Sequence, residues 1–182
     1  MRPCDTPDIA PSGHREARWF IVGDIDDELR PLGRPKCRVD SYELTTMRPW
    51  HAIKLRDGSA VERKSRVGRV EMVHLAGVVG FAERWIKVRR GSWRTPAVWV
   101  EVAKRCWRDG SVEVTSLANG AEHGWSLCLD LTEPLPPAAL ATFERWAETL
   151  RARGVAASYP AWLGNRFGRE LVDLRPERLQ AV

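Results

Sequence analysis

The chain has 182 residues, of which 43% are hydrophobic, and nine tryptophans; this composition is typical of one folded domain with a substantial core and argues against a disordered chain. Its 29 Lys and Arg residues outnumber its 24 Asp and Glu residues, and the net charge of +5 favours an anionic partner. The sequence contains no apolar leader and no run of about 18 uncharged apolar residues, so we expect a cytoplasmic protein without a membrane segment.

The N-terminal half of the chain predicts strands. Residues 1–13, rich in Pro, Asp and Ser, predict a flexible leader, which leaves 14–182 as a single domain. Apolar and polar residues then alternate with a period of two, which is the pattern of a strand with one buried face. This pattern predicts strands over 14–22 and 36–44, a short helix or turn within 24–33, and two further strands within 51–66.

The segment His51–Arg66 also predicts the register of its own hairpin. A strict two-residue turn at Asp57 and Gly58 would pair Lys54 with Val61 and so mix charged and apolar side chains on each face. A three-residue loop, with Gly58 in the left-handed conformation, shifts the pairing by one residue and separates the two kinds. We therefore expect an odd loop, with the apolar residues on one face and the charged residues on the other: Lys54, Arg56, Glu62, Lys64 and Arg66.

The C-terminal half predicts both helices and strands. Val78, Phe81, Ala82 and Trp85 recur at helical spacing and predict an amphipathic helix over 77–88. Prolines before an apolar stripe and a glycine after it predict another helix. The remaining predicted elements are strands over 97–108, 111–117 and 124–132, the second helix over 136–154, and a mixed tail from 158 with a terminal helix.

Two architectures explain the alternating strands. Alternation alone favours an antiparallel sheet with one face in water. The polar faces, however, combine basic side chains with carboxylates, and enclosure of such faces in a barrel would call for a polyanion and metal ions to neutralise them. The residues on these faces are His14, Glu16 and Arg18; Arg38 and Asp40; Glu101 and Arg105; Glu113 and Thr115; and Ser126, Cys128 and Asp130.

An ordered series of short motifs resembles the CYTH, or triphosphate tunnel metalloenzyme, superfamily. The resemblance spans about residues 14 to 164: it begins at His14, Glu16 and Arg18 and continues through RVDSY, AIKLR, VERKSR, KRCWRDGSVEV, GWSLCLDL and SYPAWL. The resemblance implies an α+β fold in which a closed antiparallel eight-stranded β-barrel forms a tunnel, with helices packed on the outside.

The resemblance also implies roles for individual residues. It implies that Glu16 and Lys64 are catalytic and that Mg²⁺ or Mn²⁺ is bound by Glu16, Glu113 and Asp130. The implied ligands of the phosphates are Arg18, Arg38, Lys54, Arg56, Lys64, Arg66 and Arg105. The chain departs from the family pattern at His14 and Cys128, which occupy positions where the family has glutamates.

Three functions remain open at this point. The first is a metal-dependent phosphohydrolase that acts on inorganic tripolyphosphate or on an organic or nucleoside triphosphate. The second, favoured by the loss of carboxylates, is a non-catalytic tunnel that binds polyphosphate or a nucleotide. The third is a basic nucleic-acid-binding domain, ranked last because the basic residues share one strand face with acids. A buried structural thiol is the preferred interpretation of Cys128, and base stacking is a minor alternative for Trp107.

Overall fold

The computed structural model describes residues 13–44, 46–58, 60–90, 99–120, 122–131 and 134–166. The leader expected over 1–13 lies outside these ranges except for Gly13, as does the tail after residue 166. The elements, in chain order, are β1 (His14–Val22), η1 (Asp27–Leu29), β2 (Lys36–Glu43), β3 (His51–Arg56), β4 (Ala60–Leu75), β5 (Val78–Arg90), β6 (Trp99–Asp109), β7 (Val112–Asn119), β8 (Glu122–Asp130), α1 (Pro137–Arg153), β9 (Val155–Ala156) and α2 (Tyr159–Arg166).

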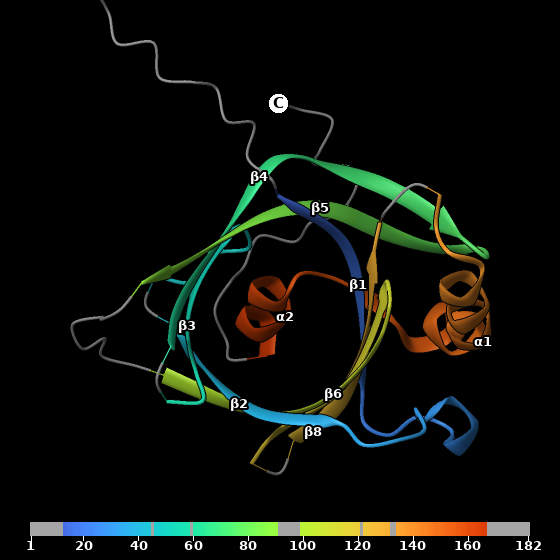
Figure 1. Ribbon diagram of the computed structural model, residues 1–182, viewed down its shortest axis with the longest axis horizontal. Helices are drawn as coiled ribbons and strands as arrows, with labels where there is room; N and C mark the ends of the chain where they lie inside the picture. Colours follow the sequence, from blue (N-terminus) through green and yellow to red (C-terminus); the bar gives the residue numbers. More distant parts are fainter. Residues whose placement is uncertain are drawn as a thin grey trace, which may run out of the picture.

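The described strands β1 to β8 close into an antiparallel barrel, as expected (Figure 1). The strand order is β5-β4-β3-β2-β6-β7-β8-β1, and pairing of β1 with β5 closes the ring. On one edge β1 pairs with β8 from Glu16 to Val22, and on the other edge its first half pairs with β5, from His14 opposite Trp85 to Ala17 opposite Ala82. The second half of β1 instead pairs with the short strand β9, at Trp19 and Phe20.

The β3–β4 hairpin has the predicted odd loop. Lys54 pairs with Glu62 and Leu55 with Val61, so the pairing leaves three residues, 57 to 59, between the strands. Asp57 and Gly58 both adopt positive φ, 48° and 70°. The expected separation of the charged face from the apolar face is therefore confirmed.

The helix expected over 77–88 is wrong, because this segment is strand β5. Trp85 faces the barrel interior with Lys64 and Lys87, whereas Val78 belongs to the apolar cluster on the outside of the barrel. The apolar residues of β5 imitate the helical spacing because the buried face changes along the strand, from Val78 and Ala82 to Trp85.

Close packing of β1 against β5 fixes this wall of the barrel. A Cβ at Gly80 would lie 2.2 Å from the ring of Trp19, so only glycine leaves room for the indole. The same indole donates its Nε1–H to the carbonyl oxygen of Val79 at 2.9 Å. The bulky indole of Trp19 on β1 thus requires a glycine, Gly80, at the facing position of β5.

Of the two helices, only α1 packs on the outside of the barrel, where both were expected. Helix α1 packs on the outside, where Phe143 and Trp146 are buried against outward-facing residues of β1, β7 and β8. Helix α2 instead lies within the ring of strands (Figure 1), with Tyr159 and Leu163 buried among inward-facing residues of β1, β2, β3, β6 and β7. In the described ranges, no helix combines the length and apolarity needed to cross a bilayer.

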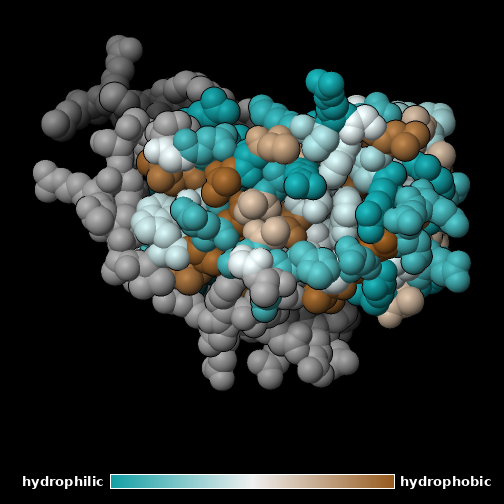
Figure 2. Space-filling model, turned by 90° about the horizontal axis from the view of Figure 1, so that it is seen from below, coloured by the Kyte–Doolittle hydropathy of each residue, from teal (hydrophilic) through white to brown (hydrophobic). Residues whose placement is uncertain are grey.

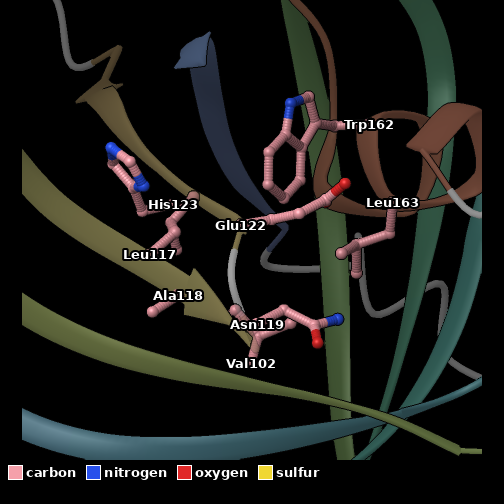
Figure 3. A pocket seen from close by; sticks show the side chains of 8 residues that line it. All are labelled: Val102, Leu117, Ala118, Asn119, Glu122, His123, Trp162 and Leu163. Carbon is pink, nitrogen blue, oxygen red and sulfur yellow. The ribbon is translucent and has the colours of Figure 1, made fainter. Parts of the chain in front are cut away.

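Helix α2 closes one end of the barrel. Phe20 stacks on Trp162 with ring centroids 4.7 Å apart and meets Tyr159 edge-on at 5.1 Å. Where Trp162 and Leu163 approach β6, β7 and β8, a crevice of only about 10 Å³ remains (Figure 3). The interior is therefore apolar and filled at the α2 end, and the larger space among the described residues lies toward the β6–β7 turn.

Candidate functional site

The barrel encloses a charged cavity of about 160 Å³. Tyr159 and Pro160 of α2 bound it at one end, and Arg108 and Ser111 line it beside the β6–β7 turn. Eight cationic side chains and four carboxylates line it: Arg18, Arg38, Lys54, Arg56, Lys64, Lys87, Lys104 and Arg108, and Glu16, Glu62, Glu113 and Asp130. Positive charge therefore exceeds negative charge in this lumen, even when the adjoining Asp40 is counted.

The structure brings together most of the side chains selected from the sequence. Those that line the lumen are Glu16, Arg18, Arg38, Lys54, Arg56, Lys64, Glu113 and Asp130. Arg66 lies apart from this lining and pairs with Glu83 at 2.9 Å. The inward placement of Arg105 is wrong, because on β6 the inward-facing neighbour is Lys104, while Arg105 is exposed.

Asp40 is the centre of the basic wall. Its carboxylate is fully buried and lies 2.8 Å from Nζ of Lys104 and 3.1 Å from Nζ of Lys54. Arg38 and Arg56 approach the same carboxylate at 3.6 and 3.5 Å. Burial alone would raise the pKa of Asp40, but Lys104 and Lys54 outweigh it and hold that pKa well below its ordinary value. One ionised carboxylate thus fixes four cations on the lumen wall.

Two of these cations have pKa values close to neutrality. Burial, together with the neighbouring charge of Lys104, lowers the pKa of Lys54 to about 7. Burial likewise lowers the pKa of Lys104 to about 8, although Asp40 opposes the shift. Lys104 also donates to the hydroxyl of Tyr42 at 2.6 Å and lies 3.9 Å from the ring centre of Tyr159. An anion that approached these two lysines would stabilise their protonated, positively charged forms.

Glu62 lies opposite Lys54 and is shared between two cations. Its carboxylate is 3.4 Å from Lys54 and 3.4 Å from Arg56, and it makes no recorded contact with Lys64. Burial alone would raise the pKa of Glu62, but Lys54 and Arg56 lower it. Glu62 therefore orients Lys54 and Arg56 on β3 rather than Lys64 on β4.

Arg18 and Glu113 form a second pair across the lumen. The guanidinium of Arg18 lies 3.2 Å from Glu113, 3.0 Å from the hydroxyl of Ser126, and 4.5 Å from the ring centre of Tyr159. Burial alone would raise the pKa of Glu113, but Arg18 and Arg38 lower it to about 2. The negative charge of Glu113 is therefore engaged with arginine.

A third group of side chains lies where β1 begins and β8 ends. One ligand atom each of His14, Glu16 and Asp130 lies within 4.8 Å of the other two. Glu16 also accepts a hydrogen bond from Lys64 at 2.6 Å, and Asp130 pairs with Arg108. Glu113 does not belong to this group. Two carboxylates and an imidazole form a donor set suited to a divalent cation.

Several guanidinium donors in the lumen lack acceptors. Among the described residues, Nε of Arg18, Arg38 and Arg56 is buried without a hydrogen-bond partner, and Nε of Arg38 and of Arg56 makes only the longer ion-pair contacts with Asp40, at 3.6 and 3.5 Å. Buried donors are usually satisfied, and guanidinium groups bind phosphate oxygens through charge-assisted hydrogen bonds. The wall therefore retains hydrogen-bonding capacity suited to anionic oxygens.

Cys128 is not an activated nucleophile. Its side chain is buried in the lumen wall, and burial raises its pKa well above the ordinary value. A nucleophilic cysteine requires the opposite shift. The structure thus agrees with the interpretation of Cys128 as a structural thiol.

The sequence provided no strong signal for Lys87, Lys104 or Arg108. Lys104 was hidden because it continues the inward face of Val100 and Val102, and Lys87 lies on the segment misread as a helix. Comparison with models of known protein families and with curated protein sequences gives no match. The side chains that line the lumen are therefore the basis for inferring its function.

Proposed function

We propose that the lumen binds a linear triphosphate, either inorganic or attached to an organic group, and that the protein hydrolyses it with the help of a divalent cation. The observation that carries the proposal is the excess of cations over carboxylates around a cavity closed at one end by α2. A compact, highly charged anion balances this excess better than a singly charged ligand does.

The basic side chains would position and polarise the chain of phosphates. The guanidinium groups of Arg18, Arg38 and Arg56, which line the lumen, would donate charge-assisted hydrogen bonds to phosphate oxygens. Lys54 and Lys104 would be held protonated by that anion. Because Asp40 already fixes most of these cations, they would not need to reorganise when the phosphates enter.

Mg²⁺ or Mn²⁺ fits the group formed by His14, Glu16 and Asp130. The donor set comprises two carboxylates and one imidazole, all at the rim of the phosphate-binding wall. A bound cation would withdraw charge from a terminal phosphoryl oxygen. Glu16 and Asp130 would hold it there and would exchange their present partners, Lys64 and Arg108, for the metal.

Binding without hydrolysis is the second candidate function. It is favoured by the pairing of every carboxylate in the lumen lining with a cationic side chain. An enzyme needs at least one carboxylate available to the metal or to the attacking water. If these ion pairs persist when phosphate binds, the lumen would act as a sensor or carrier of polyphosphate.

We also propose a cytoplasmic location. Among the described residues, Cys37, Cys106 and Cys128 are free thiols. Reducing compartments keep cysteines in this state.

Isothermal titration calorimetry with tripolyphosphate in EDTA, followed by a phosphate-release assay with Mg²⁺ or Mn²⁺, tests both candidates. Lys64→Ala should weaken tripolyphosphate binding by roughly tenfold, because it removes a charge-assisted contact. Glu16→Gln should retain binding but abolish phosphate release. Arg63→Ala, an exposed neighbour on the same strand, is the matched control and should change neither.

The outcomes separate the candidates. Binding in EDTA without phosphate release under either cation would replace the hydrolase by the binding function. No binding of tripolyphosphate to the wild-type protein would overturn both.

A further inference from the structure

A second, larger cavity lies on the outside of the barrel and adjoins the lumen. It has a volume of about 760 Å³ and lies between residues 29–36, strands β6 and β7, and helix α1. We call it the outer groove. Trp107 holds its first wall in place by donating its indole N–H to the carbonyl oxygen of Gly33 at 3.1 Å. Arg145 and Trp146 of α1 form the opposite wall.

The outer groove is strongly basic. Its lining contains six cationic side chains and two carboxylates: Arg30, Arg34, Lys36, Arg38, Arg108 and Arg145, and Asp109 and Glu113. Arg34, Lys36 and Arg145 are exposed and form no ion pair with any described residue. The face shown in Figure 2 is largely hydrophilic toward the side of η1 and α1. Positive charge therefore continues from the lumen onto the surface.

The lumen and the outer groove share three lining residues. Arg38, Arg108 and Glu113 belong to both cavities, so the groove begins at the end of the lumen farthest from α2. Since α2 fills the opposite end, an anionic chain longer than the lumen has to leave through this end. The unpaired cations of the groove lie where such a chain would continue.

The groove offers little surface for nucleobases. Trp107 is stacked on Trp125 at 5.9 Å and is engaged with Gly33, while Trp146 is only 1% exposed. Proteins that bind single-stranded nucleic acid present open aromatic faces on which bases stack. Guanidinium and ammonium groups without such faces match a chain of phosphates that carries no bases.

We propose that the outer groove binds the continuation of a linear inorganic polyphosphate whose terminal phosphates occupy the lumen. The proposal rests on the proposed function and deepens it, because it assigns the preferred ligand as a chain longer than tripolyphosphate. The lumen holds the end of the chain, Arg38 and Arg108 lie at the passage, and Arg34, Lys36 and Arg145 hold the part outside.

The experiment compares the affinity of the full chain for tripolyphosphate and for a polyphosphate several times longer, by calorimetry in EDTA. The triple variant Arg34→Ala, Lys36→Ala and Arg145→Ala should bind tripolyphosphate as the wild type does. Its affinity for the longer chain should fall by roughly tenfold, as expected for the loss of three exposed phosphate contacts. The salt dependence of long-chain binding should become shallower as well.

The matched control removes the same charge elsewhere. Arg63→Ala, Arg69→Ala and Arg84→Ala eliminate three exposed arginines of β4 and β5, away from the groove. This control variant should bind both ligands as the wild type does. Separately, normal binding of tripolyphosphate by the groove variant shows that the groove variant is folded.

Two results would overturn the proposal while leaving the proposed function intact. One is equal affinity of the wild type for the short and the long chain, with no effect of the groove variant. The other is tighter binding of a 5′-triphosphorylated RNA than of polyphosphate, with only the RNA lost in the groove variant. Failure of the wild type to bind tripolyphosphate at all would overturn the proposed function itself.

Discussion

Asp40 shows how a single residue can organise a site that it does not line. Its carboxylate is absent from the lumen surface, yet it contacts Arg38, Lys54, Arg56 and Lys104. Without it, these cations would repel one another in a buried setting and their side chains would splay apart. Because one negative charge serves four positive ones, the wall is ordered but remains positive. Asp40 thus holds these four cations in place before an anion binds.

His14 adds an imidazole to the two carboxylates of the candidate cation site. Its Nε2 approaches both Glu16, at 3.7 Å, and Asp130. An imidazole ligand favours first-row transition metals, whereas an all-carboxylate set suits Mg²⁺. We therefore expect His14 to shift the preference of the proposed cation site from Mg²⁺ toward Mn²⁺.

We predict that His14→Ala lowers the affinity for Mn²⁺ by roughly tenfold or more, because one of three protein ligands is lost. Electron paramagnetic resonance of free Mn²⁺ measures this without any substrate. His14→Glu should restore binding with a preference moved toward Mg²⁺. His74→Ala, at an exposed position on β4, is the control and should leave both affinities unchanged. Unaltered Mn²⁺ affinity in His14→Ala would show that the cluster is not a metal site.

At the scale of elements, α2 determines the shape of the cavity. Leu163 is 1% exposed and packs inside the barrel with Leu117 and Val102. We predict that Leu163→Ala costs about 2–5 kcal/mol of unfolding free energy, because it leaves a void in a confined apolar cluster. Urea denaturation measures the loss.

Leu140→Ala on α1 provides the comparison for Leu163→Ala. Leu140 is 37% exposed, so its truncation should cost clearly less than that of Leu163. Equal losses for the two variants would mean that α2 does not pack inside the barrel as described.

The strands show which parts of the site could be predicted from sequence. The register of β3 and β4 was predictable because Lys54, Arg56 and Glu62 are charged on one face while the other face is apolar. That contrast identified a polar interior and most of the side chains around the cavity. It was sufficient because both strands run along the charged part of the lumen.

The same contrast misled on β6 and β5. The inward face of β6 changes along its length, from Val100 and Val102 beside α2 to Lys104 beside Asp40. Sorting by polarity therefore placed Arg105 inside and did not reveal that Lys104 faces inward. On β5 the buried face changes between Ala82 and Glu83, which interrupted the alternation. Neither error could be corrected without knowing that a helix fills part of the barrel.

At the scale of the whole molecule, the barrel divides into an apolar half and a charged half. The α2 half contributes an apolar cluster to stability, and the other half contains eight cationic side chains around a small cavity. Segregation of this kind lets the apolar packing offset the cost of bringing like charges together. The basic site is therefore sustained by packing elsewhere in the barrel, and its protonation should respond to whatever anion neutralises it.

We predict that the affinity for tripolyphosphate falls by roughly tenfold between about pH 6 and about pH 9. The pKa of Lys54 is lowered to about 7 and that of Lys104 to about 8, so both lose their charge across this range in the free protein. A bound anion favours the protonated forms, and binding near pH 8 must therefore take up protons. Calorimetry in buffers of different ionisation enthalpy measures this uptake.

The ligand also titrates in this range, so the contribution of the protein is isolated by comparing variants. Lys54→Arg keeps its proton throughout the range and should reduce the proton uptake and flatten the decline in affinity with pH. Lys36→Arg, an exposed position outside the lumen, should leave the uptake of the wild type unchanged. Equal uptake by the wild type and Lys54→Arg would mean that Lys54 is already fully charged before the anion binds, and the lumen would then lack the pH response inferred from its burial.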